Sequence, residues 1–322
     1  MAFFLVTGGC GFIGSHLTST LVASGHRVRV LDDLSVGKAE NLSPSATLVV
    51  GDIRDQDVVK RALDGVDGCF HLAAIVSVTE CENEWRNSHQ VNLTGAVNVF
   101  RAAAKRPDPV PVVYASSAAV YGNARELPVR EDAVPLPINV YGADKAACEL
   151  HAGAIARAGG ASITGLRFFN VYGSGQDPSS PYSGVVSVFC ERLMRREPVT
   201  IYGDGRQTRD FVHVSDVVRA MVSAMRTAPA DAQVYNVCTG RPTPVLELAH
   251  KIGALTLGRG PQIRFEQARD ADIMHSTGDA SRAAAELNFR ASIAMDAGLA
   301  ELISDLDEAC RLGRQSIRIA AQ

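Results

Sequence analysis

The sequence has no surplus of positive charge, no long apolar run and no clustered cysteines. Its 322 residues carry a formal net charge of −3, so it offers no basic surface for nucleic acid or for an anionic membrane. No apolar run approaches the ~18 residues that a membrane-spanning helix needs. We therefore expect neither a nucleic-acid partner nor a membrane. With 46% hydrophobic residues, the chain can form a large core.

Cysteines are scattered, and no histidine lies in a metal-binding pattern. The seven cysteines are odd in number and none forms a C-x-x-C pair, so we expect reduced, buried thiols in a cytoplasmic protein. The histidines and acids lack a ligand spacing such as H-E-x-x-H, and we expect no metal. The apolar start, Met-Ala-Phe-Phe-Leu-Val, has no basic stretch and continues into Thr-Gly-Gly. It predicts a buried strand and not a signal peptide.

The first expected strand leads into a glycine-rich turn and then into a helix. Residues 3–7 form an apolar run typical of a parallel strand, and residues 13–24 carry apolar positions at helical spacing. Gly8, Gly11 and Gly14 lie between or at the start of these elements. Such glycines let backbone N–H groups approach a pyrophosphate at the N-terminus of the helix. The pattern predicts a dinucleotide-binding turn.

Two aspartates close the next strand. Residues 27–31 predict a strand, and Asp32 and Asp33 follow it. Asp32 stands at the distance from the glycine turn at which an acid can bond the ribose hydroxyls of adenosine. Because a carboxylate there repels a 2′-phosphate, the sequence favours NAD over NADP.

Further strands alternate with helices. Residues 47–50, 68–72 and 110–114 predict strands, and residues 55–64 and 90–105 predict helices. This alternation predicts an α/β fold with a Rossmann-like, doubly wound parallel sheet, in which ligands bind at the carboxyl edge of the strands. The residues expected at that edge are Asp52 and Ile53, Ala73 and Ala74, and Ser116 and Ser117.

Two histidines fall inside apolar strands. His71 lies in the run 68–72 and His213 in the run 210–214. A histidine in such a position is more often a satisfied core residue than a catalyst. We therefore expect both side chains to be buried in the core.

A tyrosine and a lysine lie one turn apart on a predicted helix. Tyr141 and Lys145 are four residues apart, which places them on one helix face. A Lys ammonium beside a phenol favours the phenolate, and the hydroxyl of Ser117, brought to the same point, can hydrogen-bond a substrate oxygen. Together the three residues can take a proton from an alcohol or return one to a ketone.

The regular alternation fades after residue 173. Gly, Ser, Pro and Asp are frequent over 173–182, and a helix near 184–196 and a strand at 199–205 are expected next. We therefore expect a smaller C-terminal α/β substrate lobe over the sheet. The predicted NAD-binding domain covers residues 1–168 and about 211–240, and the predicted substrate lobe covers about 169–210 and 241–322.

Several linked motifs lie in order along essentially the whole chain. They are Thr-Gly-Gly-x-Gly-Phe-Ile-Gly at 7–14, Gly-Asp-Ile at 51–53, His-Leu-Ala-Ala at 71–74, Ser-Ser-Ala-Ala-Val-Tyr-Gly at 116–122, Tyr-x-x-x-Lys at 141–145 and Arg-Phe-Phe-Asn at 167–170. With these motifs the sequence resembles the extended short-chain dehydrogenase/reductase family. Within that family it is most similar to the nucleotide-sugar 4-epimerases.

The resemblance implies NAD as the cofactor and a UDP-sugar as the substrate. Tyr141 would take the proton from the 4-hydroxyl of the sugar, Lys145 would hold the nicotinamide ribose, and Ser117 would bond the 4-oxygen. Epimerisation would pass through a 4-keto sugar that turns over in the pocket. The expected cofactor-binding residues are Gly8, Gly11, Phe12, Ile13, Gly14, Asp32, Asp33, Asp52, Ile53, Leu72, Ala73, Ala74, Asn92, Tyr141, Lys145 and Phe168.

The resemblance also implies a diphosphate clamp in the second half. Asn170, Arg209 and Arg269 match family positions that contact the diphosphate, and arginine pairs with phosphate oxygens bidentately. Tyr202 falls where the family places an aromatic ring against uracil. The expected substrate-binding residues are Ser77, Ser117, Asn170, Tyr202, Arg209, Arg269 and Ser276.

Ser276 bears on the choice of sugar. In similar epimerases a bulky residue at this position restricts the enzyme to glucose and galactose, while a small one leaves room for a 2-acetamido group. We therefore expect UDP-GlcNAc and UDP-GalNAc to be accepted as well as UDP-Glc and UDP-Gal. Val76 replaces a Lys that some galactose epimerases carry, which points away from that subgroup.

Two residues beside the Tyr–Lys pair depart from the family pattern. Val140 and Asp144 stand where the family often has Pro and Ser, and Asp144 could pair with Lys145 or with an arginine. The family likeness also suggests a homodimer through the helices near 92–105 and 141–158.

Two other functions stay open. A related sugar-nucleotide dehydratase or decarboxylase begins with the same oxidation, although Ala118 stands where such relatives often carry an acid. A non-catalytic NAD-binding regulator could share the fold, but it would have no reason to keep Ser117, Tyr141 and Lys145 together.

Overall fold

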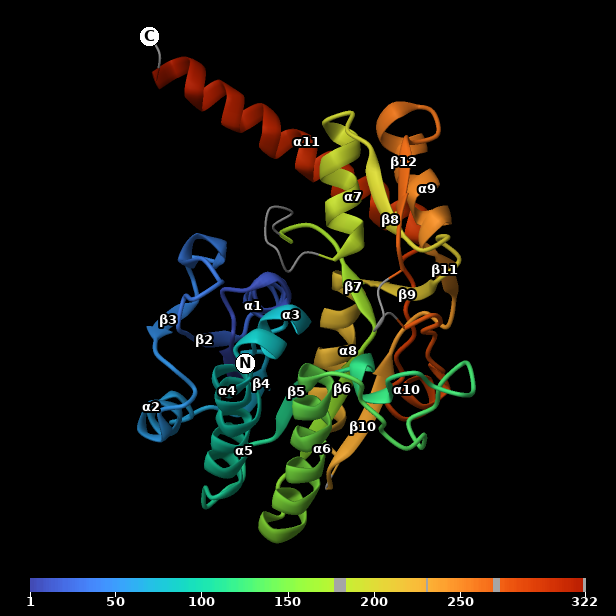
Figure 1. The fold of residues 1–322 in the computed structure, drawn as a ribbon. Coiled ribbons are helices and arrows are strands. Elements are labelled where there is room, and N and C mark those ends of the chain that lie inside the picture. Colours follow the sequence, from blue (N-terminus) through green and yellow to red (C-terminus); the bar gives the residue numbers. More distant parts are fainter. Residues whose placement is uncertain (177–183, 230, 269–272, 321–322) are drawn as a thin grey trace.

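A seven-stranded parallel sheet forms the centre of the computed structural model, which describes residues 1–176, 184–229, 231–268 and 273–320 (Figure 1). The strand order is β10-β6-β5-β4-β1-β2-β3. The order reverses beside β1, so the sheet is doubly wound as predicted, and the switch point, where ligands bind in such sheets, lies at the carboxyl ends of β1 and β4. The strands are β1 (Phe3–Thr7), β2 (Arg27–Asp32), β3 (Thr47–Val50), β4 (Gly68–His71), β5 (Val112–Ser117), β6 (Ile163–Phe168) and β10 (Gln233–Val237).

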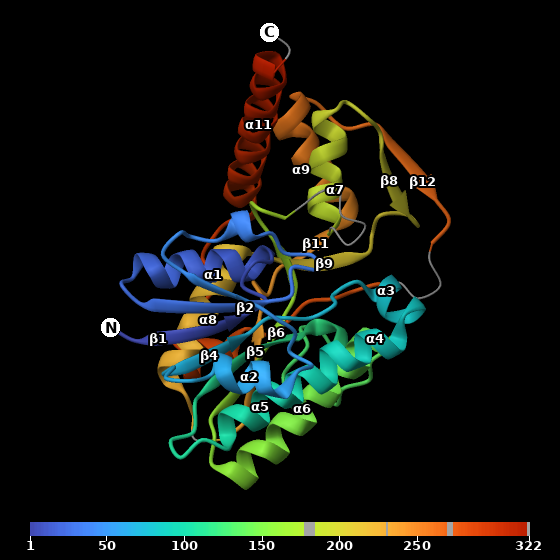
Figure 2. The same ribbon diagram turned by 90° about the vertical axis from the view of Figure 1, so that its left-hand side faces the viewer.

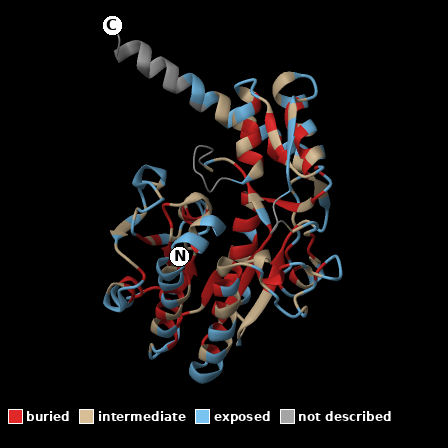
Figure 3. Ribbon diagram, viewed as in Figure 1, coloured by how far each residue is buried: buried red, intermediate tan, exposed pale blue. Residues whose placement is uncertain are grey.

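Helices cover both faces of this sheet, as Figure 2 shows. On one face lie α1 (Phe12–Ala23) and α8 (Val214–Thr227), and on the other lie α2 (Gln56–Ala62), α5 (Ala96–Ala104) and α6 (Val140–Gly159). Each face has its own apolar core, to which Leu17 and Met221 contribute on the first face and Phe100 and Ala152 on the second. Apart from the edge strand β3, which has no buried residue, the strands are therefore largely buried (Figure 3), which explains their continuous apolar runs.

The structure corrects the predicted bounds of two elements. The helix expected at 90–105 begins earlier, with α4 (Trp85–His89), and passes through a π-helical segment, η2 (Gln90–Gly95), before α5. Strand β5 ends later than predicted, because Ala115, Ser116 and Ser117 continue the parallel ladder with β6. The two serines are thus the last residues of the strand and do not follow it.

Two smaller sheets and three helices form a lobe beside the carboxyl edge of the main sheet. The lobe has its own apolar core, which includes Leu193, Leu248 and Leu299. The three-stranded sheet has the order β11-β9-β7, and β8 pairs with β12. Its elements are β7 (Asn170–Tyr172), α7 (Val185–Met194), β8 (Val199–Tyr202), β9 (Thr208–His213), β11 (Pro242–Pro244), α9 (Val245–Leu257), β12 (Ile263–Glu266) and α11 (Met295–Ala320). The remaining short elements are η1 (Ala39–Asn41), α3 (Val78–Asn83), η3 (Ala118–Tyr121) and α10 (Ser281–Glu286).

The histidines and cysteines lie largely where the sequence predicted. His71 is buried, and its Nδ1 lies 2.7 Å from the hydroxyl oxygen of Thr7. His213 is also buried, and its Nδ1 accepts a hydrogen bond from the backbone of Ser215 at the start of α8. Six cysteines are buried free thiols, as expected, whereas Cys310 is exposed.

The described part of the chain contains neither a membrane span nor a cluster of metal ligands. None of its helices is both long and apolar enough to cross a membrane. Within the same residues, no three His, Cys, Asp or Glu side chains come together as a metal site would require.

Candidate active site

The glycine turn packs tightly at the carboxyl end of β1. Gly8 has a φ of +70°, a left-handed conformation that favours glycine, and a Cβ there would lie 2.6 Å from the backbone nitrogen of Ala73. A Cβ on Gly14 would lie 2.1 Å from the carbonyl oxygen of Gly8. Helix α1 therefore starts directly against the strand, and no side chain caps it at Gly11. These residues fit a dinucleotide, because a pyrophosphate needs such exposed N–H groups at a helix N-terminus.

The first residues of α1 and the end of β2 border the glycine turn. Phe12 and Ile13 form the first turn of the helix and are partly exposed. Asp32, at the end of β2, accepts hydrogen bonds from the backbone of Cys10 and of Leu34, each at 2.9 Å. This buried acid thus borders the glycine turn, whereas Asp33 lies at the surface.

Asp52 and Ile53 follow β3 at the same edge of the sheet. Asp52 forms an ion pair with Arg54 at 2.6 Å. The hydrogen bond from that guanidinium holds the pKa of Asp52 below its ordinary value. Ile53 is buried against Gly95. The carboxylate is therefore charged at neutral pH and Ile53 anchors the loop.

The segment after β4 is held in place by an asparagine. The side chain of Asn92 accepts from the backbone nitrogen of Ile75 at 2.8 Å and donates to the carbonyl oxygen of Ile75 at 2.9 Å. Leu72, Ala73 and Ala74, which lead to Ile75, are partly exposed beside the glycine turn. Asn92 thus fixes the backbone of a predicted cofactor-binding segment by contacts of its own side chain.

The elements that carry the predicted proton-transfer residues pack together at the carboxyl end of β5. Tyr141 and Lys145 lie one turn apart on α6, and Lys145 Nζ is 5.8 Å from the centroid of the Tyr141 ring. Lys145 is buried and donates to the carbonyl oxygen of Ala115 in β5 at 2.9 Å. The lysine therefore joins the helix to the strand that ends in Ser117.

Ser117 lies where β5 turns into η3. Its hydroxyl oxygen accepts from the backbone nitrogen of Ala119 at 3.1 Å. The start of α6 packs against this turn, since a Cβ on Gly142 would lie 2.6 Å from the carbonyl oxygen of Ala119. Phe168 pairs with Ser117 across the ladder between β5 and β6. Both residues are thus beside the N-terminal end of the helix that carries Tyr141.

Among the described residues, Asp144 pairs neither with Lys145 nor with an arginine. Its Oδ1 lies 2.8 Å from Nδ1 of His89 in α4, and its Oδ2 is buried without a hydrogen-bond partner among the residues that the structure describes. Lys145 points instead toward Ala115. The reason is geometric: consecutive residues of a helix project about 100° apart, so neighbours do not face each other.

A buried ion pair supports this centre, and the sequence analysis missed it. Arg167 of β6 donates two hydrogen bonds to the carboxylate of Glu149 in α6, at 2.9 and 2.7 Å. Glu149 also accepts from the hydroxyl of Ser116 at 2.5 Å. Glu149 lies one turn after Lys145, and Ser116 directly precedes Ser117. A charged residue inside an apolar strand was the signal that could have revealed the pair.

The predicted substrate residues of the lobe gather around β9. Asn170 of β7 is exposed and pairs with Phe211 of β9. Arg209 lies two residues before Phe211 and so projects from the same face of the sheet as Asn170. Arg209 donates to the carbonyl oxygen of Thr208, which also accepts from the backbone of Ser276 at 3.1 Å. Arg209 and the backbone of Ser276 therefore share one acceptor, and Asn170 lies on the neighbouring strand.

The other predicted substrate residues lie nearby or outside the description. Tyr202 is the last residue of β8, and Gln207 donates to its carbonyl oxygen at 2.8 Å. Ser77 is buried and caps α3, where its hydroxyl oxygen accepts from the backbone of Glu80 at 3.1 Å. Arg269 lies outside the described residues.

Comparison with known proteins gives related enzymes over the full length of the chain. The sequence is 35% identical over 305 residues to a UDP-glucose 4-epimerase of Mycolicibacterium smegmatis, covering 93% of this chain and 96% of that protein. The fold matches a UDP-glucose 4-epimerase of Thermotoga maritima, solved with UDP-glucose, at a TM-score of 0.91 and 34% identity, covering 96% and 99% of the two chains. It matches a UDP-N-acetylglucosamine 4-epimerase of Methanobrevibacter ruminantium, in complex with UDP-N-acetylmuramic acid, at a TM-score of 0.90 and 32% identity, covering 96% and 99%.

The family assignment agrees with the resemblance seen in the sequence. The NAD dependent epimerase/dehydratase family matches residues 4–238, a range that contains the glycine turn, Ser117, Tyr141 and Lys145. The chain is therefore an NAD-dependent enzyme that belongs to the epimerase/dehydratase family, in the nucleotide-sugar epimerase branch of the extended short-chain dehydrogenases/reductases.

Proposed function

We propose that this enzyme inverts carbon 4 of a UDP-hexose, and that it accepts UDP-GlcNAc and UDP-GalNAc as well as UDP-Glc and UDP-Gal. The observation that carries the proposal is that Lys145 and Gly142 hold α6, the helix of Tyr141, against the end of β5 and the turn that follows Ser117. The glycine turn lies at the same edge of the sheet, so an alcohol carbon held by Ser117 and Tyr141 would lie beside the bound cofactor.

Each of the three residues has a distinct task in this reaction. Tyr141, as a phenolate, takes the proton from the 4-hydroxyl and later returns it. Lys145 places its positive charge one helix turn from Tyr141 and holds the nicotinamide ribose. Ser117 donates its hydroxyl proton to the 4-oxygen, because its oxygen already accepts from Ala119. Bound NAD supplies a reversible hydride acceptor for carbon 4.

A clamp on the diphosphate allows the sugar to turn while the nucleotide stays fixed. Asn170 and Arg209 project from one face of the small sheet, and Arg269 would add a second cation. A diphosphate carries about two negative charges, which two guanidinium groups can pair with. Tyr202 would lie against the uracil ring.

The room beside carbon 2 sets the range of sugars. Ser276 is small and partly buried, and its backbone is tied to Thr208. A 2-acetamido group can occupy the volume that a larger side chain would fill. Ser77 accepts its capping bond through the hydroxyl oxygen, so its proton is available to a sugar hydroxyl. The M. ruminantium relative, named for UDP-N-acetylglucosamine, supports this range.

The division into domains and the assembly follow from the same proposal. Residues 1–168 and about 211–240 would bind NAD, and about 169–210 and 241–322 would bind the UDP-sugar. A homodimer would form through α5 and α6, on whose outer surface Leu150 is 76% exposed. The buried free thiols favour a reducing compartment such as the cytoplasm.

A dehydratase or decarboxylase of the same family is the main alternative. Elimination after the oxidation needs a further acid or base beside the sugar. Ala118 directly follows Ser117 at the start of η3 and has no group that can transfer a proton. The position next to the active-site serine therefore favours epimerisation.

Separate incubations with UDP-GlcNAc, UDP-Glc and UDP-GlcA, followed by NMR of the products, test the proposal. We expect inversion at carbon 4 for the first two sugars. Loss of water would identify a dehydratase, and loss of CO2 from UDP-GlcA would identify a decarboxylase. An enzyme that leaves all three sugars unchanged would contradict the proposed function.

A further inference from the structure

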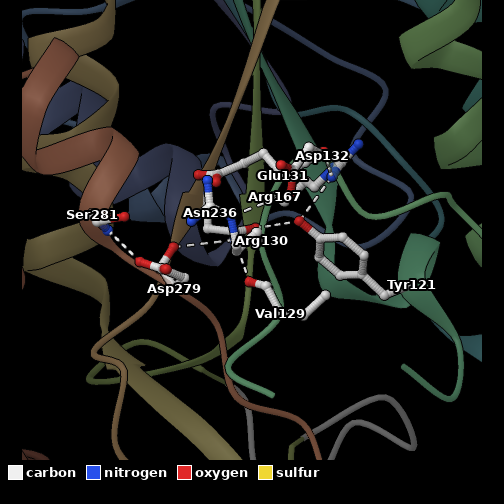
Figure 4. Close-up of polar contacts among 9 residues, drawn as sticks. All are labelled: Tyr121, Val129, Arg130, Glu131, Asp132, Arg167, Asn236, Asp279 and Ser281. Atoms are coloured by element: carbon white, nitrogen blue, oxygen red, sulfur yellow. Dashed lines mark hydrogen bonds and ion pairs between the residues drawn. The ribbon is translucent and has the colours of Figure 1, made fainter. Parts of the chain in front are cut away.

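The side chain of Asn236 connects three segments of the chain that meet only in the folded protein. Asn236, in β10, is fully buried. Its amide nitrogen donates to the carbonyl oxygens of Val129 at 3.0 Å and of Asp279 at 3.2 Å, and its amide oxygen accepts from the hydroxyl of Tyr121 at 2.6 Å (Figure 4). Two carbonyl acceptors require the NH2 group on that side, so the amide has one satisfactory orientation.

Tyr121 links this amide to the proton-transfer centre. It is the last residue of η3, the turn that begins after Ser117. Its hydroxyl donates to Asn236 and accepts from the Arg167 guanidinium at 2.8 Å. Burial raises the pKa of Tyr121 to about 12, so the phenol keeps the proton that this bond needs. Arg167 in turn holds Glu149 on the helix of Tyr141 and Lys145.

On its other side the amide bonds to the segment 276–279, which begins with Ser276, the predicted sugar contact. Ser276 is tied through its backbone to Thr208 of β9. Further along, the backbone of Val129 donates to Thr277 at 2.8 Å and accepts from Asp279 at 2.9 Å. The segment is thus held at one end by the lobe and at the other by Val129, the residue whose carbonyl Asn236 also binds.

We propose that Tyr121 and Asn236 are positioning residues that set the place of Ser276 relative to Ser117 and Tyr141, and so determine how the site distinguishes sugars that differ at carbon 2. This rests on the proposed function, because it takes Ser276 as the residue beside carbon 2. The bonds that carry it measure 2.6, 3.0 and 3.2 Å, and they leave no donor or acceptor of the fully buried Asn236 amide without a partner.

Loss of one of these bonds should weaken the binding of the larger sugar more than that of the smaller one. A 2-acetamido group fills the space beside Ser276, so its fit depends on where the segment lies. A sugar with a 2-hydroxyl leaves room there and tolerates a shift. The glycine turn follows β1, which lies four strands from β10 in the sheet, so we expect NAD binding not to change.

The experiment compares two Tyr→Phe variants that each remove one buried hydroxyl. Tyr121→Phe breaks the link to Asn236. Tyr235→Phe is the control: Tyr235 neighbours Asn236 on β10, and its buried hydroxyl donates to Glu286 at 2.7 Å, away from the site. The dissociation constants of UDP-GlcNAc and UDP-Glc are measured by calorimetry with NAD present, together with the NAD content and the thermal midpoint.

We expect Tyr121→Phe to raise the dissociation constant of UDP-GlcNAc about fivefold more than that of UDP-Glc, which is the scale of one hydrogen bond. For Tyr235→Phe, the ratio of the two dissociation constants should stay within about twofold of the parent ratio. Equal ratios in the two variants would overturn the inference. If Tyr121→Phe does not fold, the ratio of the two dissociation constants in Asn236→Ser tests the inference instead. An enzyme that binds both sugars but inverts neither would refute the proposed function, while the binding ratio still decides this inference.

Discussion

The Oδ1 atom of Asp144 lies 2.8 Å from Nδ1 of His89, and this contact crosses from α6 to α4. The carboxylate is almost fully buried, while the imidazole is half-exposed. The pair therefore fastens the helix of Tyr141 and Lys145 to the helix that leads into Asn92. This relationship explains the acid that departs from the family pattern: it serves the packing of two helices.

The contact predicts unequal effects on stability when either partner is replaced. His89→Ala leaves a buried carboxylate without its partner, so we expect it to destabilise the protein by about 1–3 kcal/mol. Asp144→Ser removes the carboxylate and its unpartnered Oδ2, so we expect little change or a small gain. Urea unfolding of both single variants and of the double variant measures the coupling. A destabilised Asp144→Ser beside an unchanged His89→Ala would contradict this account.

Replacement of Tyr141 tests the proton transfer. Tyr141→Phe removes the phenol and leaves the ring beside Lys145, so we expect NAD and UDP-sugar to bind as before. Turnover should fall by at least ~100-fold, the scale of general acid–base catalysis. Steady-state rates and the NAD content of the purified enzyme check both parts, with Tyr235→Phe as a control that loses a remote hydroxyl. Unchanged turnover would show that Tyr141 does not transfer the proton.

A larger side chain at position 276 should narrow the range of sugars. Ser276→Tyr fills the space proposed for the 2-acetamido group, and we expect kcat/KM for UDP-GlcNAc to fall by at least about tenfold. The value for UDP-Glc should stay close to that of the parent enzyme. Ser276→Ala keeps the space open and serves as the control. Equal losses for both sugars would show that size at this position does not select the substrate.

His71 should make folding stability depend on pH. Burial, helped by the positive charge of Lys145, lowers the pKa of His71 from 6.5 to about 3. Between these values the unfolded chain binds the proton and the folded chain does not. Stability therefore falls as pH decreases from about 6.5 toward 3, by up to about 1.4 kcal/mol per pH unit.

Urea unfolding at pH 7, 6 and 5 measures this dependence. His71→Asn keeps a polar group near Thr7 and removes the titration, so we expect the variant to lose less stability per pH unit than the parent. Each variant is compared with itself across the pH range, since the substitution has its own cost at pH 7. Parallel slopes for the two proteins would contradict a neutral, buried His71.

The sequence was informative where local chemistry decides the structure. The glycine turn could be predicted because Gly8 and Gly14 stand at the close contacts that a side chain would block. Tyr141 and Lys145 could be placed on one helix face from spacing alone, and the alternation of apolar runs predicted the parallel sheet. Each of these inferences needs only residues that are near one another in the chain.

Contacts between distant segments could not be predicted. Nothing in the sequence pairs Asp144 with His89, Arg167 with Glu149, or Asn236 with Tyr121, because each pair is set by how whole elements pack. The extension of β5 to Ser117 was missed for the same reason, since those residues join the strand only by pairing with β6. The role of Arg269 stays a prediction from the family pattern.

The position of β10 has a consequence for how the chain folds during synthesis. This edge strand pairs with β6, yet the ribosome makes it only after β7, α7, β8, β9 and α8. Until then β6 presents an open edge that can pair wrongly with another chain. The sheet is complete only when β10 has paired with β6. We therefore expect a chain cut short before Gln233 to be prone to aggregate through the open edge of β6.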